Sequence, residues 1–149
     1  RSFFRLNKEG WKLIICGDGP LLDELIELSK KLGISDQVEF TGVVKNIDDY
    51  YKRASIFAFS SLSEGFPNVL LEAMNYGCAC ISTDCPTGPS LLIKNNFNGF
   101  LIPLGDKSSY TNHFQKLIDD EKTRNFFVGN SIKSLENYSL NKVAEQWVN

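Results

Sequence analysis

The sequence predicts an α/β fold in which a parallel, doubly wound sheet is covered by helices on both faces. Short and almost entirely apolar runs alternate along the chain with segments whose apolar residues recur at helical spacing. Strands buried on both faces of a parallel sheet read as such apolar runs, and helical crossovers connect them. The chain has 149 residues, of which 42% are hydrophobic, and this is enough for one domain with its own core.

Five short runs are predicted to be strands, and turn residues bound most of them. The dipeptide Asn98-Gly99, for example, is typical of a turn and precedes the last run. In chain order, we expect strands at Lys12–Cys16, Val38–Thr41, Ser55–Ser60, Ala79–Thr83 and Phe100–Ile102. Ligands of such sheets bind beyond the carboxyl ends of the strands, so the loops that follow these runs are the candidate binding loops.

The segments between the runs carry helical signals. The first contains Leu21, Leu25 and Leu28 at helical spacing, and Gly33 is suited to end it. Pro20 suits the first position of this helix, where its missing N–H costs nothing. Further helices are expected at Ile47–Ala54, Asn68–Tyr76 and Pro89–Lys94, and from Lys107 onward with breaks near Asp119 and Tyr138.

Composition excludes several classes of function. Lysine and arginine number 16, aspartate and glutamate 18, and no basic stripe stands out, so nucleic acid is not an expected partner. With His113 as the single histidine, we expect no metal site. No apolar run approaches the roughly 20 residues of a membrane-spanning helix. The four cysteines, Cys16, Cys78, Cys80 and Cys85, are expected to be free thiols in a reducing compartment.

The segment from Glu64 to Glu72 is the strongest candidate for a functional site. Two carboxylates separated by seven residues flank the predicted start of a helix, and Gly65 and Pro67 shape the backbone between them. Unpaired N–H groups and the dipole at a helix N-terminus favour a bound phosphate. Carboxylates on either side can accept hydrogen bonds from hydroxyl groups. These parts suit a ligand with a diphosphate and two polyhydroxyl ends, which is the chemistry of a nucleotide sugar.

A purely structural reading of the same residues is also open. Glu72 could be a favourable partner of the helix dipole, and Glu64 could be an exposed loop acid.

The segment Ser63–Ala73 resembles the Glu-x7-Glu motif of the large retaining glycosyltransferase family 4, whose members have the GT-B fold. Five further blocks are similar to family blocks and follow the family order: Leu13–Pro20, Val38–Gly42, Tyr50–Phe59, Cys85–Ser90 and Asn98–Pro103. The resemblance therefore covers roughly Lys12 to Pro103. One departure is Leu91, at a position where the family often has glutamate.

The resemblance implies that residues 1–149 are a single Rossmann-like three-layer α/β/α domain, the C-terminal, donor-binding half of a GT-B enzyme. It places an N-terminal domain and the first strand of this domain upstream of Arg1, together with an arginine and a lysine that neutralise the donor diphosphate. Arg5 and Lys8 do not match those positions. Arg1–Leu6 is interpreted as the tail of an amphipathic helix, and Trp147 is expected to be exposed in such a fragment.

The resemblance also implies roles for individual residues. Glu64 would contact hydroxyls of the transferred sugar, and Glu72 would accept hydrogen bonds from the ribose. Gly17 and Gly19 would let the first loop approach the ligand, and the loop with Val43 and Lys45 would lie near the base. The backbone that would hold the sugar and the phosphates consists of Gly65, Phe66, Pro67, Asn68 and Val69.

The implied activity is transfer of a hexose or N-acetylhexosamine from a nucleotide sugar, expected to be a UDP-sugar, in bacterial surface-polysaccharide synthesis. The acceptor would be a glycan or a lipid-linked saccharide held by the N-terminal domain, so the isolated chain would be inactive. Retention would follow front-side attack assisted by the leaving phosphate, without a protein nucleophile, metal or cofactor. The expected location is the cytoplasm, including peripheral contact with the inner face of the cytoplasmic membrane.

Two alternatives stay open. One is a non-catalytic module that binds a nucleotide sugar, and the other is an epimerase or phosphorylase with the same GT-B architecture. A dinucleotide cofactor is not expected, because the glycine-rich fingerprint after the first strand has Leu22 in place of its third glycine.

Overall fold

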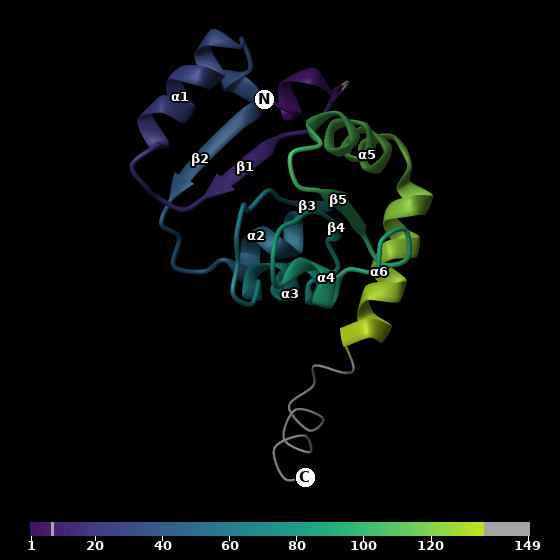
Figure 1. The fold of residues 1–149 in the computed structure, drawn as a ribbon. Coiled ribbons are helices and arrows are strands. Elements are labelled where there is room, and N and C mark those ends of the chain that lie inside the picture. The colour runs from purple at the N-terminus through teal and green to yellow at the C-terminus, as the bar shows by residue number, and fades with distance from the viewer. Residues whose placement is uncertain (7, 136–149) are drawn as a thin grey trace.

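The structure, a computed structural model, describes residues 1–6 and 8–135 as parallel sheets with helices on both faces (Figure 1). One sheet pairs β1 (Leu13–Cys16) with β2 (Val38–Gly42), and the other has the order β3 (Ile56–Phe59), β4 (Ala79–Asp84), β5 (Phe100–Pro103). The pairings between these named strands are parallel. The predicted α/β class is confirmed. Among the described residues the strands form two parallel sheets, since no pairing joins β1 to β3.

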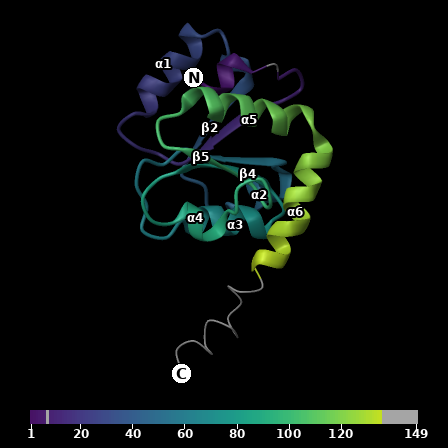
Figure 2. The same cartoon turned by 45° about the vertical axis from the view of Figure 1, so that its right-hand side comes forward.

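Two layers of helices enclose these strands (Figure 2). Helices α1 (Leu22–Lys31) and α5 (Lys107–Asp119) lie on one face. On the other face lie the shorter helices α2 (Asp48–Arg53), α3 (Asn68–Asn75) and α4 (Pro89–Leu92). Helix α6 (Glu121–Leu135) runs along one side from the α5 layer towards the α3 layer. No helix within the described ranges is long and apolar enough to cross a bilayer.

The element boundaries follow the sequence signals with two corrections. Helix α1 begins at Leu22, so Pro20 lies in the preceding turn, which is closed by a 3.0 Å hydrogen bond from the Leu22 N–H to the Gly19 carbonyl. Arg1–Leu6 does not continue an α-helix. It forms the 3-10 turn η1 (Phe3–Arg5), and a second such turn, η2 (Ser35–Gln37), precedes β2. The predicted break near Asp119 separates α5 from α6. Tyr138 and Trp147 lie outside the described residues.

Side chains along a strand point alternately to the two faces of the sheet, and this divides the core into two clusters. Ala79 and Ile81 of β4 join the cluster beneath α5, whereas Cys80 joins the cluster around Leu70 and Met74 of α3. These five residues have no exposed surface. All the cysteines are free thiols, as predicted. Burial raises the pKa of the Cys78 thiol to about 11, so this thiol stays protonated at neutral pH.

Asn98 is a fully buried polar residue that joins three segments of the chain. Its Oδ1 accepts a hydrogen bond from the Lys94 N–H at 2.7 Å, and its Nδ2 donates to the Leu92 carbonyl at 2.9 Å. The same amide group donates to Ser134 Oγ at 3.2 Å. The hydroxyl of Ser131 donates to the Asn98 carbonyl at 3.0 Å. Asn98 thus connects α4, the turn before β5 and α6.

Candidate functional site

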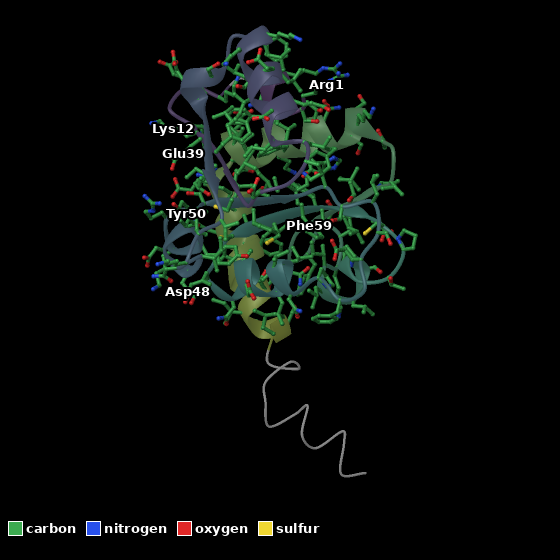
Figure 3. The ribbon with its side chains drawn as sticks, turned by 90° about the vertical axis from the view of Figure 1, so that its left-hand side faces the viewer. Arg1, Lys12, Glu39, Asp48, Tyr50 and Phe59 are labelled. Atoms are coloured by element: carbon green, nitrogen blue, oxygen red, sulfur yellow. The ribbon has the colours of Figure 1, made fainter. Side chains whose placement is uncertain are left out.

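The loops predicted to form a site all follow the carboxyl ends of parallel strands. Residues 17–20 follow β1, residues 43–46 follow β2, and residues 60–67 and 85–88 follow β3 and β4. Figure 3 shows Phe59 at the end of β3, α2 with Asp48 and Tyr50, and the β1–β2 pair with Lys12 and Glu39. The sequence therefore placed these loops at strand ends correctly, where α/β proteins bind ligands.

Glu64 is held by contacts to both its side chain and its backbone. The Ser61 hydroxyl donates to Glu64 Oε1, and the Thr87 hydroxyl donates to the Glu64 carbonyl. Ser61 is itself fixed, because Thr83 Oγ1 at the end of β4 donates to its carbonyl at 2.6 Å. Side-chain hydrogen bonds from two strand ends therefore orient a half-buried carboxylate, which differs from the exposed, unconstrained acid of the structural reading.

The loop with Thr87 and Gly88 packs tightly against the Glu64 loop. Gly88 has a φ of 118°, which only glycine adopts readily. A Cβ built at Gly88 would stand 2.8 Å from Pro67 Cδ and 3.4 Å from Glu64 Cβ. Thr87, with a φ of 54°, also has a left-handed backbone. Both residues are shaped for a close approach to the segment that leads into α3.

Glu72 lies in α3 and is exposed. Its Oε2 accepts a hydrogen bond from the Tyr51 hydroxyl at 3.2 Å, and that hydroxyl is also 3.3 Å from the Val69 carbonyl. Burial, and then the negative charge of Glu72, raise the pKa of Tyr51, so Tyr51 is a permanent donor. No acidic residue lies in the first turn of α3. This disfavours the dipole-partner reading of Glu72, because the dipole effect fades beyond that turn.

The backbone amides at the start of α3 are only partly available to a ligand. The Asn68 N–H donates to the Phe66 carbonyl at 3.0 Å, and Pro67 has no N–H. Within the described ranges, the N–H groups of Gly65 and Val69 have no partner in the chain. The predicted donation to a ligand therefore does not hold for the Asn68 N–H or for Pro67, and it stays a prediction for the rest of the stretch.

The loops after β1 and β2 form a second corner of the candidate site, and they contain the predicted residues Gly17, Gly19, Val43 and Lys45. The Gly17 N–H donates to the Gly42 carbonyl at 2.8 Å and ties the two loops together. Asp18 Oδ1 accepts from the Gly19 N–H at 2.7 Å, and Val43 is 81% exposed. In the part of the chain that the structure describes, no hydrogen bond or ion pair joins this corner to Glu64 or Glu72.

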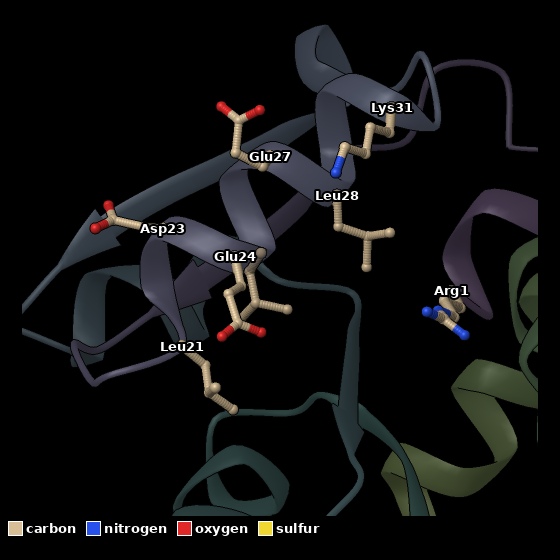
Figure 4. Close-up of a pocket in the computed structure, with 8 residues that line it drawn as sticks. Arg1, Leu21, Asp23, Glu24, Glu27, Leu28 and Lys31 are labelled. Atoms are coloured by element: carbon tan, nitrogen blue, oxygen red, sulfur yellow. The ribbon is translucent and has the colours of Figure 1, made fainter.

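A cavity of about 520 Å³ lies between α1 and Arg1 (Figure 4), and none of the residues of these loops lines it. Among the described residues, no group of His, Cys, Asp and Glu side chains could hold a metal ion. Lys8 Nζ donates a hydrogen bond to the nearby Leu6 carbonyl at 3.4 Å.

The site roles predicted for the loop residues stay predictions.

Three residues that support the carboxylates were not singled out from the sequence: Tyr51, Ser61 and Thr87. Each acts across 18 or more residues or through a short loop contact, and no local motif marks it. The position of Tyr51 on the inner face of a short helix was the one available signal.

Comparisons with known proteins bear on the family and on the fold. A family model described as glycosyl transferases group 1 matches residues 2–134. An alpha-1,4-N-acetyl-D-galactosaminyltransferase of Campylobacter jejuni, whose name includes a GalNAc saccharide on PP-undecaprenol, is 31% identical over 141 residues, 95% of this chain and 39% of the relative. The chain spans about two fifths of the length of the first curated relatives that it matches, 40% and 39%.

Two solved structures have the same fold. HepE of Anabaena, solved in complex with UDP, matches with a TM-score of 0.87 at 21% identity, over 99% of this chain and 42% of that one. The C-terminal domain of a glycosyl transferase group 1 family protein (LpcC) of Francisella tularensis matches with a TM-score of 0.80 at 26% identity, over 90% of this chain and 73% of that one.

Proposed function

The chain belongs to the group 1 glycosyltransferases, and we propose that it is the donor-binding half of a retaining enzyme that uses a UDP-sugar. The observation that carries the proposal is the arrangement of Glu64 and Glu72 around the start of α3. Ser61 donates to the first carboxylate, Thr87 donates to the backbone carbonyl of the same residue, and Tyr51 donates to the second carboxylate. The complex of HepE with UDP supports the choice of nucleotide, because that protein shares the fold.

Each carboxylate has a distinct role in this proposal. Glu72 accepts hydrogen bonds from the ribose hydroxyls, and Glu64 accepts them from the transferred sugar. The free N–H groups of Gly65 and Val69 donate to the sugar and the diphosphate, aided by the dipole of α3. Gly17 and Gly19 allow close approach of the first loop, and Val43 and Lys45 border the base. Glu64 positions the donor for front-side attack, so neither a protein nucleophile nor a metal takes part.

The finer assignment is part of the same proposal. The transferred unit is a hexose or N-acetylhexosamine, and the acceptor is a glycan or lipid-linked saccharide of bacterial surface-polysaccharide synthesis. The name of the Campylobacter jejuni relative supports a lipid-linked acceptor. The reaction takes place in the cytoplasm or at the inner face of its membrane. An assay of UDP-sugar turnover by a longer protein that contains this chain distinguishes an enzyme from a non-catalytic binding module. The proposal expects turnover, whereas a binding module would show none.

Binding of UDP to the chain is the direct test. Millimolar UDP is expected to slow amide hydrogen exchange in residues 64–72 and to leave α5 unchanged, because ligand contacts protect only the segment they touch. If UDP, GDP and ADP all leave the exchange of residues 64–72 unaltered, the proposal of nucleotide binding is wrong. The assignments of family and fold do not depend on this result.

Substitution of the two carboxylates tests their separate roles. Glu72→Ala is expected to weaken UDP binding roughly 10-fold or more, since hydrogen bonds to a charged group are each worth about 1.5–3 kcal/mol. Glu64→Ala is expected to change UDP affinity by less than about threefold, because UDP lacks the sugar that Glu64 would contact. Isothermal titration calorimetry measures both, with the exposed Glu121→Ala as control. The reverse order of effects would contradict the assigned roles.

Tyr51→Phe is expected to raise the Kd for UDP roughly threefold to 10-fold, because it removes one hydrogen bond of about 1 kcal/mol that orients Glu72. The ring, which stacks on Tyr76 at a centroid distance of 5.7 Å, is retained. Calorimetric titration with UDP measures the effect, and Tyr50→Phe is the control. In the Glu72→Ala background the same substitution should add almost nothing. An equal loss in both backgrounds would show that Tyr51 does not act through Glu72.

A further inference from the structure

Helices α2 and α3, which lie in the same layer (Figure 2), contact each other through one face of each helix. On α2, Asp48, Tyr51 and Lys52 are at relative positions i, i+3 and i+4, which places them on one side of the helix. On α3, Glu72 and the C-cap residue Tyr76 are four residues apart and also share a side. These two faces meet at the carboxylate of Glu72.

The carboxylate of Glu72 is held through one of its two oxygens. Its Oε2 accepts a hydrogen bond from the Tyr51 hydroxyl at 3.2 Å, and Oε1 accepts none from any described residue. No ion pair within the described ranges includes Glu72. The orientation of the carboxylate, and with it the direction of the open oxygen, therefore depends on where the Tyr51 hydroxyl lies.

The ring of Tyr51 is enclosed by two other aromatic rings. Tyr76 stacks on it at a centroid distance of 5.7 Å and an interplanar angle of 16°, and Phe57 meets it edge-on at 5.9 Å. Tyr51 is only 5% exposed. Its hydroxyl lies at the far end of the side chain, so a tilt of the ring displaces the hydroxyl more than any other atom. At 3.2 Å the hydrogen bond to Glu72 is already long for two oxygens, so a small displacement breaks it.

Tyr76 is itself fixed from two sides. Interaction with Asp48, chiefly a hydrogen bond, raises the pKa of Tyr76, so the phenol stays protonated at neutral pH. Lys52 Nζ lies 5.8 Å from the centroid of the Tyr76 ring, within the range of a cation–π interaction. The backbone N–H of Tyr76 donates to the Glu72 carbonyl at 3.0 Å. The ring is therefore held by α2, and the backbone belongs to the helical turn that carries Glu72.

We propose that Tyr76 is a positioning residue for Glu72. Its ring keeps Tyr51 in the orientation in which the hydroxyl donates to Glu72 Oε2, and this fixes the oxygen that is left for the ribose. The preference of the site for an intact ribose is then set partly by a residue that acts through Tyr51 and not on the ligand. This inference rests on the proposed role of Glu72 and extends it to the contact between α2 and α3.

The test compares UDP with 2′,3′-dideoxy-UDP, which lacks both ribose hydroxyls, by calorimetric titration. The unsubstituted chain is expected to bind UDP at least about 10-fold more tightly than the dideoxy compound. Tyr76→Leu, which removes the stacked ring, is expected to lower this ratio at least about threefold and to change the Kd for dideoxy-UDP by less than about twofold. General damage to α3 would instead weaken both ligands by the same factor. An equal loss for both ligands, or an unchanged ratio, would overturn the proposal.

Three further variants show whether the effect passes through Tyr51. Tyr76→Phe keeps the stacked ring and is expected to retain the ratio to within about twofold. Tyr50→Leu is the matched control, because it removes another tyrosine ring of α2, one that lies 5.0 Å from the guanidinium of Arg53 in the same helix; it should leave the ratio unaltered. In the Tyr51→Phe background, Tyr76→Leu should add almost nothing, since the hydroxyl through which it acts is absent. A full additional loss in that background would contradict the proposed route.

Failure of the proposed function gives a different result. If the unsubstituted chain binds UDP and dideoxy-UDP equally, or binds neither, Glu72 does not recognise the ribose, and the inference about Tyr76 is wrong with it. A ratio of about 10-fold that Tyr76→Leu leaves intact overturns the inference alone. Circular dichroism checks that each variant is folded. If Tyr76→Leu does not fold, Tyr76→Met takes its place with the same expected result, because a flexible methionine can fill the space of the ring.

Discussion

Replacing Asn98 with alanine is expected to lower the free energy of unfolding by about 3 kcal/mol, because it removes three hydrogen bonds of a fully buried side chain, each worth roughly 1 kcal/mol. The partners in those bonds are the Lys94 N–H, the Leu92 carbonyl and the hydroxyl of Ser134. For a chain of this size, the loss corresponds to a fall in Tm of roughly 6–12 °C. Thermal unfolding followed by circular dichroism, with urea unfolding for the free energy, measures it.

Two further variants calibrate this result. Asn46→Ala removes an exposed asparagine that donates to Asp49 at 2.7 Å, and should stay within about 0.5 kcal/mol of the unsubstituted chain. Ser134→Ala removes only one partner of Asn98 and should lie between the two. If Asn98→Ala were no more destabilising than Asn46→Ala, Asn98 would not be the joint between α4, β5 and α6 that its contacts indicate.

Gly88→Ala is expected to lower the free energy of unfolding by about 2–4 kcal/mol, from backbone strain of about 1–3 kcal/mol and a clash in a packed contact. The new methyl would lie 2.8 Å from Pro67 Cδ, and a proline ring cannot swing aside as a flexible side chain can. Relief of the clash would move the segment that carries Glu64. The variant should therefore also lose affinity for UDP-sugars, which calorimetry would measure alongside the unfolding free energy.

Gly105→Ala is the matched control for this substitution. Gly105 also has a positive φ, of 89°, but nothing lies within 4 Å of a Cβ built there. It carries the strain without the clash, so it should cost about 1 kcal/mol and leave ligand affinity unaltered. Equal losses in the two variants would mean that the contact between Gly88 and Pro67 has no part in the stability of the loop.

Apolar periodicity predicted the helices and strands because each buries its own face. The run at Ala79–Thr83 became β4 almost residue for residue, since its first four positions are buried as a continuous apolar run requires. Pairing was harder to predict. The composition of β1 and β3 identifies them as strands and does not reveal that each has an open edge, because an edge depends on which neighbour is present. Pro20 was predicted at the first position of the helix, whereas it lies in the turn before α1. The local sequence does not separate the two positions, because a proline fits both a turn and a helix start.

The candidate site was likewise predicted only in part. Glu64 and Glu72 were found from the sequence because their spacing and the residues between them form a local motif. The supports of the two carboxylates were not, since the contact from Tyr51 to Glu72 spans 21 residues and that from Thr87 to Glu64 spans 23. The Asn68 amide, which the sequence left available to a ligand, is satisfied by a turn whose geometry depends on the packing of Gly88 against Pro67.

The bond between Gly17 and Gly42 has a consequence for how ligand affinity can be tuned. It ties the loop after β1 to the end of β2, whereas Glu64 follows β3 and Glu72 lies in the helix between β3 and β4. In the proposed function, a nucleotide sugar that contacts both sets of loops would connect the two sheets. Its observed affinity would then depend on the fraction of molecules in which the sheets hold the separation that the ligand spans. By thermodynamic linkage, saturating nucleotide should raise the unfolding temperature of the β1–β2 sheet as well as that of the β3–β4–β5 sheet.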